Sequence, residues 1–306
     1  MSGIHDHAAH GHSHAPASFG RAFAIGTALN LGFVAVEAAY GVIAGSMALL
    51  ADAGHNLSDV LGLVIAWGAA TLARRAPTAR YTYGLRSSSI LAAFLNALLL
   101  LVAITIIAVK AIGRFSDPAP VAGNTVMIVA AVGIVVNGVT AWLFASGRKG
   151  DLNIRGAFLH MAADAAVSAG VVIAGFVITR TGWSWIDPVT SLAIVAVIAI
   201  GTWGLLRDSV NMSLQAAPPG IDTAGITTFL LARPGVAAIH DLHVWPLSTT
   251  ETALTVHLVV PPGVKGDGYV ADLADVLHEQ FGIDHATVQI ETGNGAPCRL
   301  EPDGVI

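Results

Sequence analysis

The sequence predicts a multi-pass α-helical membrane protein, with six transmembrane helices followed by a small soluble α/β domain. Three observations lead to this fold class. Of the 306 residues, 54% are hydrophobic and only 11% are charged, and the mean hydropathy of +0.69 is typical of membrane proteins. Six apolar segments each reach the roughly 20 residues that cross a bilayer. After Asp208, prolines and acidic residues become frequent and strand-like alternation begins.

The six predicted spans are rich in Ala and Gly, which favours close packing between helices. They lie near residues 19–40, 48–73, 88–113, 121–145, 155–180 and 186–208. The chain therefore divides into a flexible histidine-rich tail over 1–18, a six-helix membrane domain over 19–208 and a soluble domain over 209–306.

Basic residues predict how these spans are oriented. If the N-terminus is cytoplasmic, nine Lys and Arg residues lie on the inner side and only Lys110, Arg114 and Arg180 lie outside. Both termini are then cytoplasmic, and the short loops favour a bacterial inner membrane. Arg74, Arg75 and Arg86, near the inner face, could pair with Asp208 and brace the membrane part against the soluble part. Surface orientation of basic residues is the simpler explanation.

In the soluble part, residues 221–231 and 269–281 have helical periodicity, and residues 239–246, 252–260 and 287–291 alternate as strands do. The order α-β-β-α-β fits a small open sheet with helices on one face. The net charge of −5 gives no indication of nucleic-acid binding. The single cysteine, Cys298, excludes both an internal disulfide and a Cys-x-x-Cys metal clamp.

Two His-x-x-x-Asp pairs in apolar spans are the strongest sign of a functional site: His55 with Asp59, and His160 with Asp164. Their spacing puts both members on one helix face, and ionisable groups inside a membrane are costly unless they have a function. The two spans are antiparallel, so the pairs could meet near mid-membrane. Two imidazoles and two carboxylates suit one tetrahedral divalent metal, zinc above all. The alternative is four unrelated residues in interhelical hydrogen bonds.

Metal binding and protonation compete at such a site, because the histidines must be neutral and the carboxylates ionised. Exchange of a metal ion for protons is therefore chemically possible. Three other polar residues in the spans have open roles. Asp52 could cap the second helix or hydrate an exit path, Glu37 could line an aqueous cavity or face the headgroups, and Asn137 could bond a neighbouring helix.

The N-terminal tail carries a low-complexity histidine tract, which is typical of weak metal binding without a fixed geometry. We expect a flexible metal-collecting arm; the alternative is a tail with incidental histidines. Its histidines are His5, His7, His10, His12 and His14.

The segments around both pairs resemble the cation diffusion facilitator family. Residues 45–59 (GSMALLADAGHNLSD) are similar to its second-helix signature, and residues 153–164 (NIRGAFLHMAAD) to its fifth-helix signature. The similarity covers nearly the whole chain and is greatest to the zinc-exporting branch. It implies a homodimer that exports Zn²⁺, with Co²⁺ or Cd²⁺ as further cargo, in exchange for protons by alternating access. It also implies a metallochaperone-like cytoplasmic domain and a role in metal homeostasis or resistance.

The resemblance also implies roles for particular residues. The residues matching His55, Asp59, His160 and Asp164 bind the transported ion in that family, and His at the first position is associated with zinc preference. In the soluble domain, His240 and His257 match cytoplasmic metal ligands, and His285 and Glu291 match a second, dimer-linked cluster. Cys298 follows, but the further tail cysteine of many relatives is missing, which implies an open site.

Two other function classes compete with a secondary transporter. An intramembrane metalloenzyme could use a histidine–carboxylate site to activate water, but His-Glu-x-x-His is absent and four ligands leave no open position. A zinc-sensing membrane protein would not need six spans with a site at mid-membrane. We therefore expect a transporter and not an enzyme.

Overall fold

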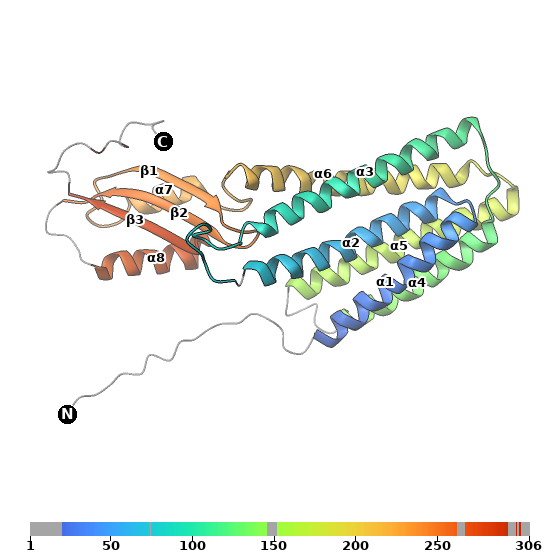
Figure 1. Ribbon diagram of the computed structural model, residues 1–306, viewed down its shortest axis with the longest axis horizontal. Helices are drawn as coiled ribbons and strands as arrows, with labels where there is room; N and C mark the ends of the chain where they lie inside the picture. The colour runs from blue at the N-terminus through green and yellow to red at the C-terminus, as the bar shows by residue number, and fades with distance from the viewer. Residues whose placement is uncertain are drawn as a thin grey trace, which may run out of the picture. The chain divides into compact units, whose positions relative to one another are not determined.

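The computed structural model describes residues 20–73, 75–145, 152–261 and 267–292, together with residues 298 and 300. The chain forms two compact units, Met1–Asn56 with Ala111–Ser191, and Leu57–Lys110 with Leu192–Ile306. The elements in order (Figure 1) are α1 (Gly20–Ile43), α2 (Met47–Ala73), α3 (Ser88–Ser116), α4 (Gly123–Ala145), α5 (Leu152–Thr181), α6 (Ile186–Ser213), α7 (Thr223–Leu231), β1 (Ala238–Pro246), β2 (Thr252–Val259), α8 (Asp267–Phe281) and β3 (His285–Glu291).

Helices α1–α6 confirm the predicted membrane fold class. Four windows in the described part of the chain are long and apolar enough to cross a membrane, and Thr27–Ile43 adds a shorter apolar helix. The four are Ser88–Ser116, Gly123–Leu143, Phe158–Thr181 and Ile186–Ser213. The sixth helix runs to Ser213, beyond the predicted end at residue 208. Hydropathy does not reveal this end, because the extra turn is polar.

Small residues let α4 and α5 of the first unit approach closely. A Cβ atom on Gly123 would lie 2.8 Å from the carbonyl oxygen of Gly175, and one on Gly175 would lie 3.0 Å from that of Gly123. Backbone therefore meets backbone at this crossing, the arrangement that small residues allow in membrane helix pairs.

The first turn of α2 is capped by Ser46 and by a carboxylate from α6. The Ser46 hydroxyl accepts from Leu49 N at 3.2 Å, and Asp187 accepts from Met47 N at 2.7 Å and from Ala48 N at 3.3 Å. The prediction that Asp52 caps this helix is wrong, because α2 begins at Met47 and Asp52 lies fully buried inside it.

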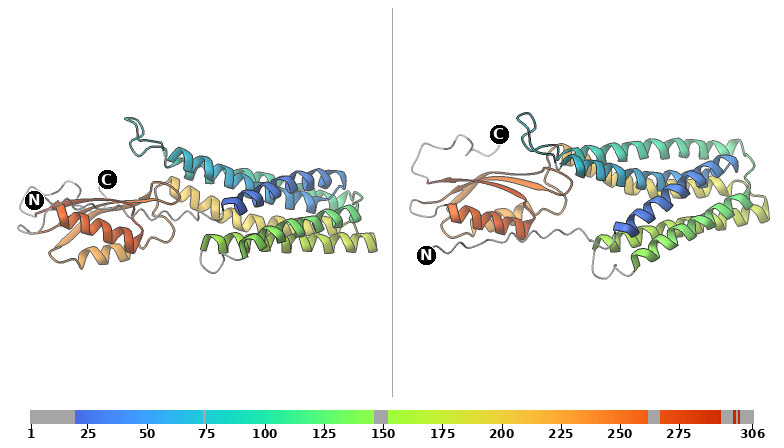
Figure 2. Two further views of the ribbon diagram at one scale, coloured as in Figure 1. Left: turned by 90° about the horizontal axis from the view of Figure 1, so that it is seen from below. Right: turned by 60° about the horizontal axis from the view of Figure 1, so that its bottom comes forward.

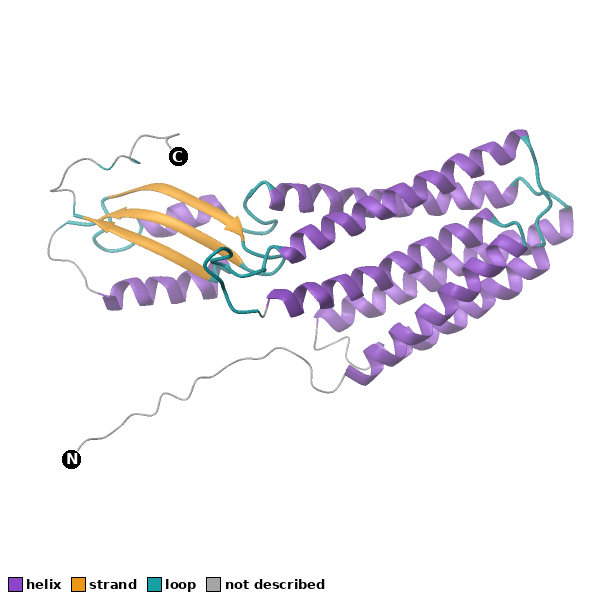
Figure 3. Ribbon diagram, viewed as in Figure 1, coloured by secondary structure: helices purple, strands orange, loops and turns teal. Residues whose placement is uncertain are grey.

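The soluble part of the second unit is a three-stranded sheet with both helices on one face. Strands β1 and β2 are antiparallel and β2 and β3 are parallel, in the order β1-β2-β3, as Figure 3 shows. Figure 2 shows α7 and α8 against the same face. The buried core between them consists of Ile226, Leu230, Leu254, Val256, Leu258, Val260, Leu273, Leu277 and Ile283. The predicted α-β-β-α-β order is confirmed.

A β-bulge in β1 decides which side chains occupy the open face of the sheet. His240 pairs with His257 and His243 with Thr255, so one extra residue lies between the two pairs. Asp241 takes a positive φ of 52° there. Because a bulge interrupts the alternation of side chains, Ile239 and Leu242 both pack against the core while His240 and Asp241 stay beside each other on the opposite side.

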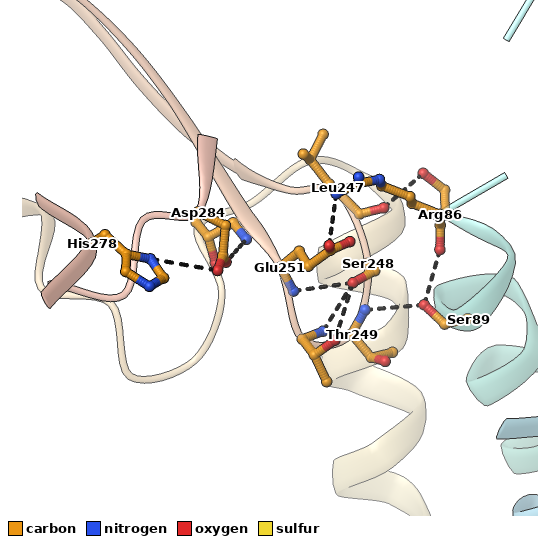
Figure 4. A network of polar contacts seen from close by, with 11 residues as sticks. Arg86, Ser89, Leu247, Ser248, Thr249, Glu251, His278 and Asp284 are labelled. Carbon is orange, nitrogen blue, oxygen red and sulfur yellow. Dashed lines mark hydrogen bonds and ion pairs between the residues drawn. The ribbon is translucent and has the colours of Figure 1, made fainter. Parts of the chain in front are cut away.

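A polar joint connects the start of α3 to the β1–β2 turn within the second unit (Figure 4). Arg86 Nη1 lies 2.6 Å from Glu251 Oε1, the Ser87 hydroxyl donates to the Leu247 carbonyl at 3.1 Å, and Thr249 N donates to the Ser89 hydroxyl at 3.0 Å. Arg86 therefore pairs with Glu251 and not with Asp208, which was the less simple of the two interpretations. Asp208 instead pairs with its neighbour Arg207 at 3.3 Å.

Candidate metal centres

The first candidate centre lies between α2 and α5, where three predicted ligands converge. His55 Nε2 lies 3.5 Å from one Asp164 oxygen, and His160 Nε2 lies 3.6 Å from the other. The two imidazole rings are 6.0 Å apart and nearly perpendicular. A tetrahedral zinc ion, with bonds of about 2.0–2.3 Å, separates its ligand atoms by roughly 3.3–3.8 Å. Both distances to Asp164 fit that range.

The exposure of these groups is uneven. The Asp164 side chain is 2% exposed, whereas His55 is 22% and His160 41% exposed. The Asp164 carboxylate is therefore the buried member of the centre, and the two imidazoles are the exposed members. Asp59 is on α2, one turn after His55; its side chain lies outside the described part of the structure.

The second candidate centre is on the open face of the sheet. His240, His257, Glu291 and Cys298 each offer one ligand atom, and all four atoms lie within 4.8 Å of one another. His257 Nδ1 is 3.0 Å from Glu291 Oε1, 3.3 Å from His240 Nε2 and 3.5 Å from Cys298 Sγ. The distances to His240 and Cys298 fall in the roughly 3.3–3.8 Å range of a zinc tetrahedron, and the distance to Glu291 is somewhat shorter.

Strand pairing explains why these residues meet. His240 and His257 are direct partners on β1 and β2. On β3, Val288 and Ile290 pack against the core. Successive side chains of a strand point to opposite faces, so Glu291 lies on the other, open face of the sheet, together with His257. Cys298 reaches this face from beyond β3. These four residues supply one ligand atom for each of the four positions of a tetrahedral metal site. The sequence alone predicts only an open site here.

Asp241 orients one of the histidines from outside the ligand set. Its Oδ2 lies 3.5 Å from His257 Nε2, the ring nitrogen away from the cluster, and its Oδ1 lies 2.8 Å from His243 Nε2. A carboxylate on the far nitrogen fixes the tautomer of a metal-binding histidine. The apolar residues at 239, 242 and 244 break strict alternation and are the sequence signal for the bulge that places Asp241 here.

Electrostatics in this cluster favour a carboxylate beside a protonated thiol. Desolvation raises the pKa of Glu291, but hydrogen bonds from Cys298 and Gln289 and the imidazoles of His240 and His257 outweigh it, so the pKa is lowered. The backbone N–H of Leu300 favours the thiolate of Cys298, yet desolvation and the Glu291 carboxylate raise its pKa. A metal ion binding here must therefore displace the thiol proton.

The remaining predicted ligands lie elsewhere. His285 begins β3 and stacks edge-on against Tyr83 at 5.6 Å. Six residues of strand, about 20 Å, separate it from Glu291, so it is not in the cluster. His278, which is not among the predicted ligands, lies 3.7 Å from Asp284 and is 63% exposed. The N-terminal histidine tract lies outside the described residues.

Comparison with known proteins identifies related sequences along most of the chain. Residues 23–212 match the cation efflux transmembrane domain, and residues 218–293 match the cation efflux protein cytoplasmic domain. The zinc transporter ZitB of Escherichia coli is 36% identical over 301 residues, which cover 95% of this chain and 96% of that protein. The metal cation efflux system protein CzcD of Cupriavidus metallidurans is 35% identical over 292 residues, covering 95% and 91%.

Two further relatives are an antiporter and a solved structure. The cadmium, cobalt and zinc/H(+)-K(+) antiporter of Bacillus subtilis is 34% identical over 286 residues, which cover 92% of each protein. A solved structure of the metal-bound C-terminal domain of the CzcD transporter from Cupriavidus metallidurans is 38% identical. It covers 23% of this chain and 99% of its own, with a TM-score of 0.22.

Proposed function

The chain belongs to the cation efflux family, and from that premise we propose that it is a zinc/proton antiporter that exports Zn²⁺ from the cytoplasm. It is a metal cation efflux transporter of the inner membrane and not an enzyme. Zinc as the main cargo, protons as the counter-ion and cytoplasmic termini are the parts we propose, with Co²⁺ or Cd²⁺ as lesser cargo.

The arrangement of His55 and His160 around one buried carboxylate, that of Asp164, is the observation that carries the proposal. Both imidazoles lie within 3.6 Å of its oxygens, and helical spacing puts Asp59 on the same face of α2 as His55. Two nitrogens and two anionic oxygens favour a small ion with tetrahedral geometry over a larger, softer one. We assign the transported ion to these four residues.

Proton exchange follows from the chemistry of the same ligands. Zn²⁺ binds the neutral imidazole and the ionised carboxylate, so protons and zinc compete for His55, His160 and Asp164. A centre that opens in turn to the two sides of the membrane would load zinc where protons are scarce and lose it where they are abundant. Rocking of helices around a fixed mid-membrane site accomplishes such alternation.

For the soluble domain we propose a regulatory zinc ion held by His240, His257, Glu291 and Cys298, and pairing of two chains into a homodimer. A metal that binds one arrangement of the domains better than another shifts the population toward it. The match to the cation efflux cytoplasmic domain supports this assignment. His285 lies apart from this cluster. For His285 we keep the role that the resemblance implies, in a second cluster linked to the dimer.

Zinc uptake into proteoliposomes tests the proposal. Purified full-length protein is reconstituted, and zinc entry is followed with a trapped indicator under an inside-acid pH gradient. We expect uptake that reverses when the gradient reverses and stops when an ionophore for protons collapses it. Uptake of equal rate with and without the gradient would show a carrier that is not coupled to protons.

A further inference from the structure

A pair of buried carboxyl groups lies beside the membrane centre but outside its ligand set. Glu37 of α1 and Asp52 of α2 are both 0% exposed, and they belong to one cluster, because Asn56, one turn after Asp52 on α2, donates to Glu37. Among the described residues, no Lys or Arg forms an ion pair with either group. We propose that Glu37 and Asp52 share one proton and form a second proton-carrying centre of the transporter.

The hydrogen-bond donors around the pair show why a proton is needed. Asn56 Nδ2 donates to Glu37 Oε2 at 3.4 Å, and the Ser168 hydroxyl donates to Asp52 Oδ2 at 3.1 Å. In the described part of the chain, no N–H or O–H donates to the remaining oxygens, Glu37 Oε1 and Asp52 Oδ1, although both are fully buried. An ionised carboxylate has no donor of its own. A proton on one of the two groups supplies the O–H donor that these buried oxygens lack.

Charge leads to the same conclusion. Two adjacent carboxylates in a buried site cannot both stay ionised, and such pairs retain one proton between them. Leaving both charged without a cation would cost far more than holding that proton. The pair is then a singly charged unit with one proton that can leave, and its two donors, Asn56 and Ser168, stabilise the charge that remains.

The position of the pair couples it to the metal ligands. Asp52 lies one turn before His55 on α2, and its partner Ser168 lies one turn after Asp164 on α5. The ionisable groups nearest to the pair along these two helices are therefore His55 of α2 and Asp164 of α5. A divalent ion at the ligands adds positive charge to this neighbourhood and favours ionisation of the pair. Its departure favours reprotonation.

This inference rests on the proposed function, and it adds a proton to its stoichiometry. On zinc binding, the shared O–H bond breaks and the proton leaves to the side to which the centre is open. When zinc leaves, a proton from the other side restores the O–H bond. No other reactant is needed, and the metal ligands exchange their own protons independently.

Proton release on zinc binding, measured with a pH dye in weakly buffered detergent solution, tests this proposal. Glu37→Gln and Asp52→Asn keep the shape and the hydrogen bonds but cannot release the shared proton. We expect each variant to bind zinc and to release about one proton fewer per zinc than the wild type. Glu251→Gln, which removes a carboxylate from the polar joint in the soluble part, is the matched control and should release the full number.

Zinc-induced infrared difference spectra of the wild type give a second measurement that does not depend on a variant folding. We expect loss of a protonated-carboxyl band on zinc addition, and that loss should be absent in Glu37→Gln. The proposal is wrong if both amide variants release as many protons as the wild type, or if zinc leaves the wild-type band unchanged. A wild type that takes up no zinc under a pH gradient would instead refute the proposed function, whatever the proton count.

Discussion

His55 offers nitrogen where a carboxylate would offer a harder, charged oxygen, so it is the ligand whose replacement should change metal preference most. Asp at this position would give the centre three carboxylates, and the extra charge and oxygen suit larger ions that tolerate looser geometry. We expect His55→Asp to raise cadmium uptake relative to zinc by about tenfold, equivalent to ~1.4 kcal/mol.

Paired zinc and cadmium uptake into proteoliposomes measures this ratio for the wild type and the variant. His278→Ala removes an exposed histidine outside both centres and serves as control, with an unchanged ratio. A His55→Asp variant with wild-type selectivity would assign metal preference to another residue.

Asp241 should act on the zinc affinity of the soluble domain without touching the metal. Its carboxylate lies 3.5 Å from the far nitrogen of His257, and loss of such a neighbouring carboxylate typically weakens a metal site about 10–100-fold. We expect this loss for Asp241→Asn, measured by competition with a chromophoric chelator in an Asp164→Ala background so that the membrane centre does not contribute. Equal affinity with and without the Asp241→Asn substitution would mean that the ring is held by other contacts.

If Cys298 binds zinc as proposed, the zinc affinity of the soluble domain should depend on pH. Because its pKa is raised, the thiol is protonated at neutral pH and zinc must displace that proton. Affinity should therefore increase as pH rises, until the pH passes the thiol pKa. Replacing Cys298 with Ala should reduce the slope of log affinity against pH by about one near neutrality, in the same competition assay. An unaltered slope would exclude the thiol as a ligand.

These residues also show what a sequence can and cannot predict about a site. The sequence predicts His55, His160 and Asp164 as ligands because helical spacing and the cost of burying charge in a membrane can both be judged within a single segment. For Cys298 the sequence indicates only an open site, because its contact with His257 joins residues 41 apart in the chain.

At the level of elements, the contact of α4 with α5 depends on glycine at the crossing. A methyl group on Gly175 would lie 3.0 Å from the Gly123 carbonyl oxygen and 3.1 Å from Met127 N, both backbone atoms. Forcing atoms into such a contact typically costs about 1–3 kcal/mol. We therefore expect Gly175→Ala to lower the melting temperature of the purified protein.

Gly170→Ala is the matched control, because it lies on the same helix and its added Cβ has nothing within 4 Å. Alanine there should leave the melting temperature unchanged or raise it, since alanine favours a helix by up to ~1 kcal/mol over glycine. Equal effects of the two substitutions would contradict the close helix crossing.

Element boundaries were predictable where one physical property dominates. The apolar length of a span fixed most of α1–α6 to within a few residues, and alternation located the three strands. The β1 bulge, the parallel pairing of β2 with β3 and the Asp187 cap on α2 were not predictable, since each depends on residues distant in sequence.

For the molecule as a whole, the polar joint provides a route by which the soluble domain could influence transport. Arg86 and Glu251 are 39% and 32% exposed, so their ion pair adds at most about 1 kcal/mol to stability. We expect Glu251→Gln to leave the melting temperature within about 2 °C and the zinc affinity of the soluble domain unchanged, while transport loses its dependence on that zinc.

Uptake rates compared with and without His257→Ala, in the wild-type and Glu251→Gln backgrounds, measure this coupling. His257→Ala should change the rate in the first background and not in the second. The same response in both backgrounds would show that regulation bypasses the joint.

The central claim is that zinc crosses the membrane through the centre formed by His55, His160 and Asp164, while the soluble cluster regulates it. Zinc uptake driven by an inside-acid gradient, measured for Asp164→Ala and His257→Ala proteins at matched reconstitution, tests this most directly. We predict that Asp164→Ala abolishes uptake and that His257→Ala retains it at saturating zinc. Uptake that survives Asp164→Ala would contradict the account.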